Sequence, residues 1–214
     1  MSVDVHAMAW HELRLKKAAD ALRRNGFTVE VLADGAAAGA WAVAQAAGAA
    51  TVGLGGSQTV RALGIPDLLV KSGVTVFTHT PEMERAERLA VWRRAQHAAV
   101  YFASPQAVSL EGELYFLDAY GNRAGAVVFG PGRVVLLAGR NKLVRDASEA
   151  RSRVRDVAAV TNNIRLKRPN PCVTAGECRD CAAASRICNV QVVLHKRPEF
   201  ADIRIGLVND DLGF

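Results

Sequence analysis

The amino-acid sequence predicts an α/β protein in which crossover helices join a parallel sheet and an antiparallel meander follows. Half of the 214 residues are hydrophobic and 22% are charged, which is typical of a globular chain able to bury a sizeable core. Strand-like and helix-like segments alternate from residue 27 to residue 103, as they do in parallel sheets. Strand-like segments between residues 113 and 138 are separated only by short turns, and such connections join antiparallel neighbours.

The chain is expected to begin with a helix over residues 1–26 that precedes an α/β domain over residues 27–214. Apolar side chains recur at helical spacing from His6 to Asn25, and Gly26 supplies a stop signal. The start lacks the basic and apolar segments of a secretory signal, and the longest apolar stretch is too short to span a membrane. We therefore expect a cytoplasmic protein without a membrane span, whose thiols stay reduced.

The first half of the domain should form the parallel part of the sheet. Its strands are short and rich in β-branched residues, and its helices start at capping residues. The predicted strands are residues 27–32, 50–54, 74–77 and 100–103. The predicted helices are residues 36–47, 57–64 and 66–72, and one that starts after Thr80 and buries Met83, Ala86, Leu89, Ala90 and Trp92.

The second half should add the meander and a late helix. The meander strands are predicted at residues 113–117, 123–129 and 133–138, with turns at 120–122 and 130–132. Asp146 and Glu149 form a capping-box pattern for a helix that ends near Val160. Two late strands are predicted at residues 190–194 and 203–208, after a cysteine-rich loop at residues 171–189.

The four cysteines are the strongest chemical signal in the sequence: Cys172, Cys178, Cys181 and Cys188. Four sulfurs within 17 residues are a complete ligand set for tetrahedral zinc or an iron–sulfur cluster. Only Cys178 and Cys181 form the close pair that zinc ribbons use twice, so we favour a [4Fe–4S] cluster over zinc. Free buried thiols and two disulfides are the alternatives.

The positive charge of the chain is concentrated just before these cysteines. The net charge is +6, and residues 140–168 alone carry 9 basic and 3 acidic side chains. Aromatic residues make up only 6% of the chain and do not interleave with this segment, so a nucleic-acid partner is not expected. The segment is better interpreted as a cationic approach to an anionic metal site.

A glycine loop after a predicted strand is a candidate anion site. It contains Gly55, Gly56, Ser57, Gln58 and Thr59, where backbone N–H groups at a helix start favour a phosphate or carboxylate. The Rossmann pattern fails because Gln58 occupies the third glycine position. A tight turn with a serine cap is an equally good interpretation.

Two further polar groups follow predicted strands and should face the same crevice as the glycine loop. One group comprises Ser109, Glu111, Glu113, Asp118, Asn122 and Arg123, and the other is Gly139-Arg140-Asn141-Lys142. Asp118 or Glu111 is a candidate acid or base, and Lys142 is a candidate catalytic clamp for a small anionic metabolite. Turn residues and a solvated cationic surface are the alternative interpretations.

Several of these motifs together resemble the LUD-domain family of lactate-utilisation proteins. They are Gly55 to Thr59, Gly112 to Arg123, Phe129-Gly130-Pro131, Gly139 to Lys142, and the loop from Pro171-Cys172 to Cys188-Asn189. The resemblance implies a fold similar to formyltetrahydrofolate cyclo-ligases, sugar-phosphate isomerases and CoA-transferases. It also implies a role with iron–sulfur partner subunits in oxidising lactate to pyruvate.

Two functions are therefore expected from the sequence. The first is an iron–sulfur-bearing accessory or redox subunit in the oxidation of lactate or a related 2-hydroxy acid. The alternative is a non-redox enzyme or sensor for a phosphorylated or carboxylated metabolite, in which the four-cysteine site, with zinc or a cluster, is purely structural.

Overall fold

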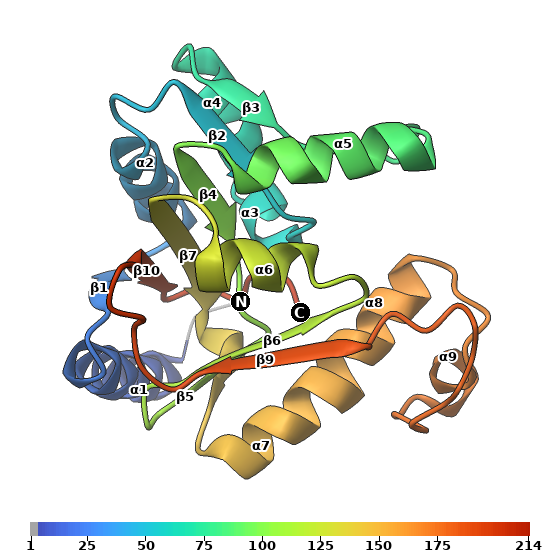
Figure 1. Cartoon of the computed structure of the whole chain (residues 1–214). Coiled ribbons are helices and arrows are strands. Elements are labelled where there is room, and N and C mark those ends of the chain that lie inside the picture. Colours follow the sequence, from blue (N-terminus) through green and yellow to red (C-terminus); the bar gives the residue numbers. More distant parts are fainter. Residues whose placement is uncertain (1–3) are drawn as a thin grey trace.

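A parallel sheet of six strands forms the centre of the computed structural model, which describes residues 4–214 (Figure 1). Every neighbouring pair in this sheet is parallel, and the C-terminal strand lies between the first strand and the centre. In spatial order the strands are β1 (Thr28–Leu32), β10 (Asp202–Val208), β7 (Arg133–Gly139), β4 (Val100–Ala103), β2 (Thr51–Leu54) and β3 (Thr75–Phe77).

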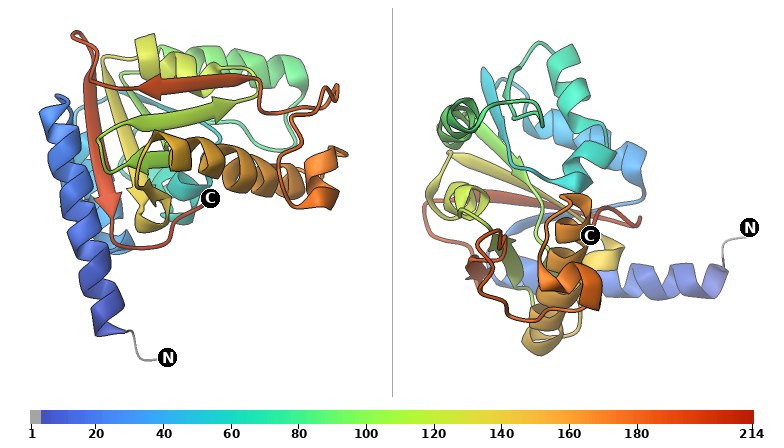
Figure 2. Two further views of the ribbon diagram at one scale, coloured as in Figure 1. Left: turned by 90° about the horizontal axis from the view of Figure 1, so that it is seen from below. Right: turned by 90° about the vertical axis from the view of Figure 1, so that its right-hand side faces the viewer.

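Helices cover both faces of this sheet because its strands are apolar on both sides. Val100 and Phe102 pack into one core with α2 (Gly35–Gln45), α3 (Gln58–Ala62) and α4 (Ile65–Lys71). The alternate residues Tyr101 and Ala103 face a second core, to which α1 (Val5–Arg24), α5 (Arg85–Gln96) and α6 (Asn122–Phe129) contribute. The N-terminal turns of α1 extend beyond the rest of the molecule (Figure 2). Residues 1–3 of the predicted first helix lie outside the described part.

A smaller mixed sheet lies against the second core. Its order is β8 (Leu143–Val144), β5 (Ala107–Ser109), β6 (Leu114–Asp118) and β9 (Val190–Leu194), and β6 is antiparallel to both of its neighbours. A continuous helix covers its other face, where Ala150 and Val154 are buried. This helix consists of α7 (Ala147–Ser152), a π-helical segment η2 (Arg153–Ala159) and α8 (Val160–Arg165), and a short helix α9 (Pro171–Ala175) follows it.

The predicted fold class is confirmed, and most predicted elements are found within a few residues of their expected bounds. The prediction of a strand at residues 123–129 is wrong, because this segment is the helix α6. Gly121 turns the chain with a φ of +75°, and the Asp118 carboxylate accepts the Ala124 N–H at 2.7 Å, so the helix start is capped by tertiary contacts. As a result, the strand at 133–139 joins the parallel sheet instead of a meander.

The helix expected after Thr80 also differs from its prediction. It begins at Arg85, because the backbone around Pro81 forms turns in which Arg88 donates to the Pro81 and Met83 carbonyls. The predicted buried face is wrong as well: α5 buries Val91 and Ala95, whereas Leu89 is 44% exposed. Among residues 4–214, no helix has both the length and the apolar character needed to cross a bilayer.

Candidate functional site

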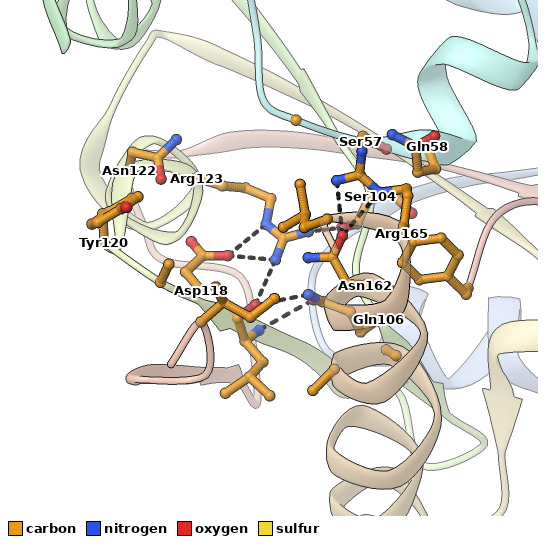
Figure 3. Close-up of a pocket in the computed structure, with 18 of the residues that line it drawn as sticks. Ser57, Gln58, Ser104, Gln106, Asp118, Tyr120, Asn122, Arg123, Asn162 and Arg165 are labelled. Atoms are coloured by element: carbon orange, nitrogen blue, oxygen red, sulfur yellow. Dashed lines mark hydrogen bonds and ion pairs between the residues drawn. The ribbon is translucent and has the colours of Figure 1, made fainter. Parts of the chain in front are cut away.

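A polar pocket opens at the carboxyl edge of the parallel sheet, where open α/β sheets commonly bind ligands (Figure 3). Its cavity has a volume of about 210 Å³. The loops after β2, β4 and β6 contribute to its wall, and the helix η2–α8 closes the opposite side. Its lining therefore includes Ser57, Gln58, Ser104, Gln106, Asp118, Asn122, Arg123, Asn162 and Arg165.

The glycine loop reaches this pocket as expected. Gly56, Ser57, Gln58 and Thr59 line the cavity, whereas Gly55 lies behind it. A Cβ atom at Gly55 would come within 2.9 Å of the Tyr101 hydroxyl oxygen, so the close packing of this loop requires glycine. The Ser57 hydroxyl accepts the Val60 N–H at 3.2 Å and caps α3.

Asp118 and Arg123 form a buried ion pair in the wall of the pocket. Arg123 donates through Nε at 2.9 Å and also through Nη2 to the same oxygen of Asp118, while the second oxygen accepts the Ala124 N–H. Arg123 also donates to the Ser104 and Leu117 carbonyls at 3.1 and 3.0 Å. Because both oxygens of Asp118 are engaged, this carboxylate orients Arg123 and the start of α6.

Lys142 lies at the base of the pocket, at the end of η1 (Arg140–Lys142), and only 2% of it is exposed. Its Nζ donates to the Thr59 and Ser104 hydroxyls at 2.7 and 2.8 Å. Burial lowers the pKa of Lys142 well below its usual value, and the nearby charges of Arg153 and Arg123 lower it further. The structure thus surrounds the amine with neutral acceptors and cations, an environment that favours its uncharged form.

The remaining charges give the pocket a strongly positive character. Within residues 4–214, four guanidinium groups line it, against a single Asp or Glu side chain, that of Asp118. They belong to Arg88, Arg123, Arg165 and Arg168. In the described chain, the buried side-chain nitrogen and oxygen atoms without a hydrogen-bond partner are the Nε atoms of two arginines that line this pocket, Arg88 and Arg168. A bound anion would offset this excess of positive charge.

An aromatic wall that the sequence reasoning missed stands beside these cations. The Trp92 Nε1–H donates to His79 Nδ1 at 3.1 Å, and the Trp92 ring lies 5.4 Å from that of His79 and 5.6 Å from that of Tyr120. An indole N–H can only donate, so His79 Nδ1 must accept. Burial, followed by Arg61, Arg88 and Arg165, lowers the pKa of His79 and keeps the ring neutral. The Thr78-His79-Thr80 segment at a strand end was the available sequence signal.

Some predicted site residues lie elsewhere. Glu111 is exposed in the turn before β6, where its carbonyl accepts from Asn25 at the end of α1. Arg140 pairs with Asp211 at 3.1 Å, and Asn141 donates to the Gly213 carbonyl at 3.0 Å. Arg140 and Asn141 thus hold the C-terminal segment against the sheet edge, and neither they nor Glu111 contribute to the pocket lining.

The four cysteines gather around one small cavity on the neighbouring face of the helix η2–α8. All four thiols are free, and Arg155, Arg179 and Arg186 line the same cavity. Burial raises the pKa of Cys172, and the nearby Cys181 raises it further. Among residues 4–214, no group of three or more His, Cys, Asp or Glu side chains is placed to hold a metal ion. By residue type, the four thiols around this cavity are nevertheless the donor set that zinc or an iron–sulfur cluster uses.

The fold and the site define an α/β protein with an arginine-lined pocket at the carboxyl edge of its sheet. A sequence model of the LUD domain matches residues 15–205, and the chain belongs to the LUD-domain family, which is associated with lactate utilisation. The structure is similar to the crystal structure of a DUF162 family protein from Deinococcus radiodurans, with a TM-score of 0.51 and 16% sequence identity. The match covers 92% of this chain and 98% of the other. Comparison with curated protein sequences gives no significant match.

Proposed function

We propose that this protein is an iron–sulfur-bearing accessory or redox subunit in the oxidation of lactate, or a related 2-hydroxy acid, to the keto acid. In this proposal Cys172, Cys178, Cys181 and Cys188 hold a [4Fe–4S] cluster, which supplies one-electron transfer when bound. The cationic pocket binds the carboxylate of the hydroxy acid or of its product. Iron–sulfur partner subunits complete the electron path.

One observation carries the proposal: the cysteine cavity and the cationic pocket are neighbours that share a wall. Ala159 of the helix η2–α8 lines both. Ile187 lines the cationic pocket, and the next residue, Cys188, lines the cysteine cavity. A redox group held by the cysteines would therefore lie next to a molecule bound in the pocket.

The residues around the cysteines suit an anionic group. A cluster with four thiolates carries net negative charge, and the Arg155 and Arg186 guanidinium groups lie beside it. Both now pair with Asp180, at 2.8 and 3.0 Å, and Arg186 also donates to the Cys181 carbonyl at 2.6 Å. These arginines shape the loop and offset the charge of its ligands.

The pocket chemistry suits a small carboxylate. Arg165 is held by Asn162, whose Oδ1 accepts from its Nε and Nη2 at 3.1 and 2.8 Å, so the guanidinium is oriented before a ligand arrives (Figure 3). Planar guanidinium groups match the two oxygens of a carboxylate. The neutral His79 imidazole, whose Nδ1 accepts from Trp92, keeps its Nε2–H as a further donor.

Anaerobic purification after iron-replete expression tests the cluster. We expect brown protein with about four iron and four sulfide per chain, whose visible absorbance bleaches with dithionite. Replacing Cys181 by Ser should lower the bound iron strongly, whereas replacing the exposed Ser148 by Ala, in α7 and outside the cysteine loop, should leave it unchanged. Colourless protein with one zinc per chain would contradict the cluster.

A hydrogen-bond network between the cysteine-rich loop and α8 supports the alternative, which is a non-redox enzyme or sensor with a purely structural metal. The buried Asn170 donates to Asn163 Oδ1 at 2.6 Å and accepts from the Ser185 hydroxyl at 2.5 Å, so a hydrogen-bond network already pins the loop to α8. Under this alternative, zinc or a cluster at the four cysteines has only a structural role, and a small phosphorylated or carboxylated metabolite binds in the pocket.

A further inference from the structure

Among the described residues, Lys142 is the one lysine that lines the pocket, and its contacts do not suit the role of an anion clamp. A clamp needs a charged ammonium, whereas this amine is almost completely buried and lies near the positive charges of Arg153 and Arg123. Within residues 4–214 it forms no ion pair with a carboxylate; its two partners are hydroxyl groups. The arrangement favours a free amine at the base of a cationic pocket.

The hydroxyl partners show how this amine is held. The Thr59 hydroxyl donates its proton to the Leu212 carbonyl at 3.1 Å, so it accepts from Lys142. The Ser104 hydroxyl has the Pro105 carbonyl at 3.1 Å and the Thr59 oxygen at 3.3 Å as its acceptors, so it too accepts from Lys142. A neutral amine has two N–H bonds, and both are engaged in this way. Its third position is a lone pair, which is what a nucleophile requires.

We propose that Lys142 is a catalytic nucleophile that forms an imine with the carbonyl carbon of a 2-oxo acid bound in the pocket. The class of ligand rests on the proposed function, because oxidation of a 2-hydroxy acid yields a 2-oxo acid. The arginines hold its carboxylate, and the carbonyl carbon lies toward Nζ.

The atoms balance without a further reactant. The Nζ lone pair attacks the carbonyl carbon, and the carbonyl oxygen takes up a proton to give a carbinolamine. That oxygen then leaves as water with the two hydrogens that were on Nζ, and a C=N bond remains. The Thr59 and Ser104 hydroxyls, at 2.7 and 2.8 Å from Nζ, are placed to relay these protons.

Reductive trapping tests the imine directly. The protein as purified is incubated with pyruvate, treated with sodium borohydride, and examined by intact mass and peptide mapping. Hydride converts the imine into a stable secondary amine, so we expect one adduct per chain, at Lys142. At pH 7 an exposed lysine is almost entirely protonated, so labelling at Lys142 should exceed labelling at the exposed Lys71 by about tenfold or more.

Matched reactions and variants keep the test decisive. Lactate has the same carboxylate but a hydroxyl group in place of the keto group, so it should give no adduct. Replacing Lys142 by Arg, or by Met in case Arg does not fit, should abolish the adduct, whereas replacing Lys71 by Arg should leave it unchanged. Folding of each variant is checked by circular dichroism.

The outcomes separate this inference from the proposed function. Pyruvate that stabilises the protein against heat but gives no adduct overturns the imine and leaves carboxylate binding intact. Equal labelling of Lys142 and Lys71 also overturns it. An adduct at Lys142 in protein that contains zinc instead of a cluster supports the imine and removes the redox role.

Discussion

The ion pair between Asp118 and Arg123 gives the sharpest test of how the pocket is built. Asp118 Oδ1 accepts two hydrogen bonds from Arg123, and Oδ2 accepts the Ala124 N–H. The side chains are only 5% and 14% exposed. Replacing Asp118 by Ala leaves a guanidinium buried without its counter-charge and removes the cap of α6. Both effects destabilise the folded state.

The expected loss is large. Breaking one partner of a buried pair costs about 3–5 kcal/mol in the free energy of unfolding. For a chain of this length about 1 kcal/mol corresponds to roughly 2–4 °C, so the melting temperature should fall by about 6–20 °C. Urea unfolding followed by circular dichroism gives the free energy, and a thermal melt gives the temperature.

Asp202 provides the matched control. It pairs with Arg133 and Arg204 at 2.8 and 3.0 Å, but its side chain is 36% exposed, so replacing it by Ala should cost below about 1 kcal/mol. Combining Asp118→Leu with Arg123→Met should recover much of the loss, because no buried charge then lacks a partner. Equal costs at Asp118 and Asp202 would refute the reasoning.

Three further predictions concern charge, packing and pH. Replacing Arg165 by Met should weaken lactate binding by about 10–150-fold in calorimetry, since a charge-assisted hydrogen bond contributes about 1.5–3 kcal/mol. Replacing the exposed Arg151, outside the pocket, should leave the affinity unchanged, and equal losses would contradict a local contact. Replacing Gly53 by Ala should destabilise the protein by about 1–3 kcal/mol, because the new Cβ would lie 2.2 Å from a backbone oxygen of α5. Gly132→Ala, where the new Cβ has open space around it, is the control, and equal urea midpoints for the two variants would count against this packing. Burial, Arg153 and Arg123 lower the pKa of Lys142 in the folded state, so between that lowered pKa and the ordinary value near 10.5 the unfolded chain binds more protons. In this range stability should rise with pH relative to Lys142→Met, by up to about 1.4 kcal/mol per unit, and urea midpoints that stay parallel from about pH 7 to 10 would rule this out.

The sequence was most informative where local signals and burial agree. Short apolar runs predicted the buried strands β2 and β4 and the strand β9. The spacing of Asp146 and Glu149 predicted a helix cap, and in the structure the Glu149 N–H donates to Asp146 at 3.0 Å. It failed at residues 123–129, which are apolar, β-branched in part and flanked by turn residues. In the structure the Asp118 carboxylate caps the start of α6, and Ala126 and Val127 pack into the core as a helical face.

The functional site likewise has features that the sequence predicted and features that depend on tertiary contacts. The sequence by itself identified the four cysteines, the glycine loop and Lys142, because their residue types and neighbours carry chemical meaning without coordinates. Tertiary structure alone decided that Asp118 is fully engaged by Arg123 and the Ala124 N–H, that the Glu111 carbonyl accepts from Asn25 at the end of α1, and that His79, Trp92 and Arg165 share the pocket. Tertiary structure also determined which hydroxyl groups and cations surround Lys142. The physical reason is that burial, hydrogen-bond partners and nearby charges come from strands and helices far apart in the chain, and these determine whether an amine is a charged clamp or a free base.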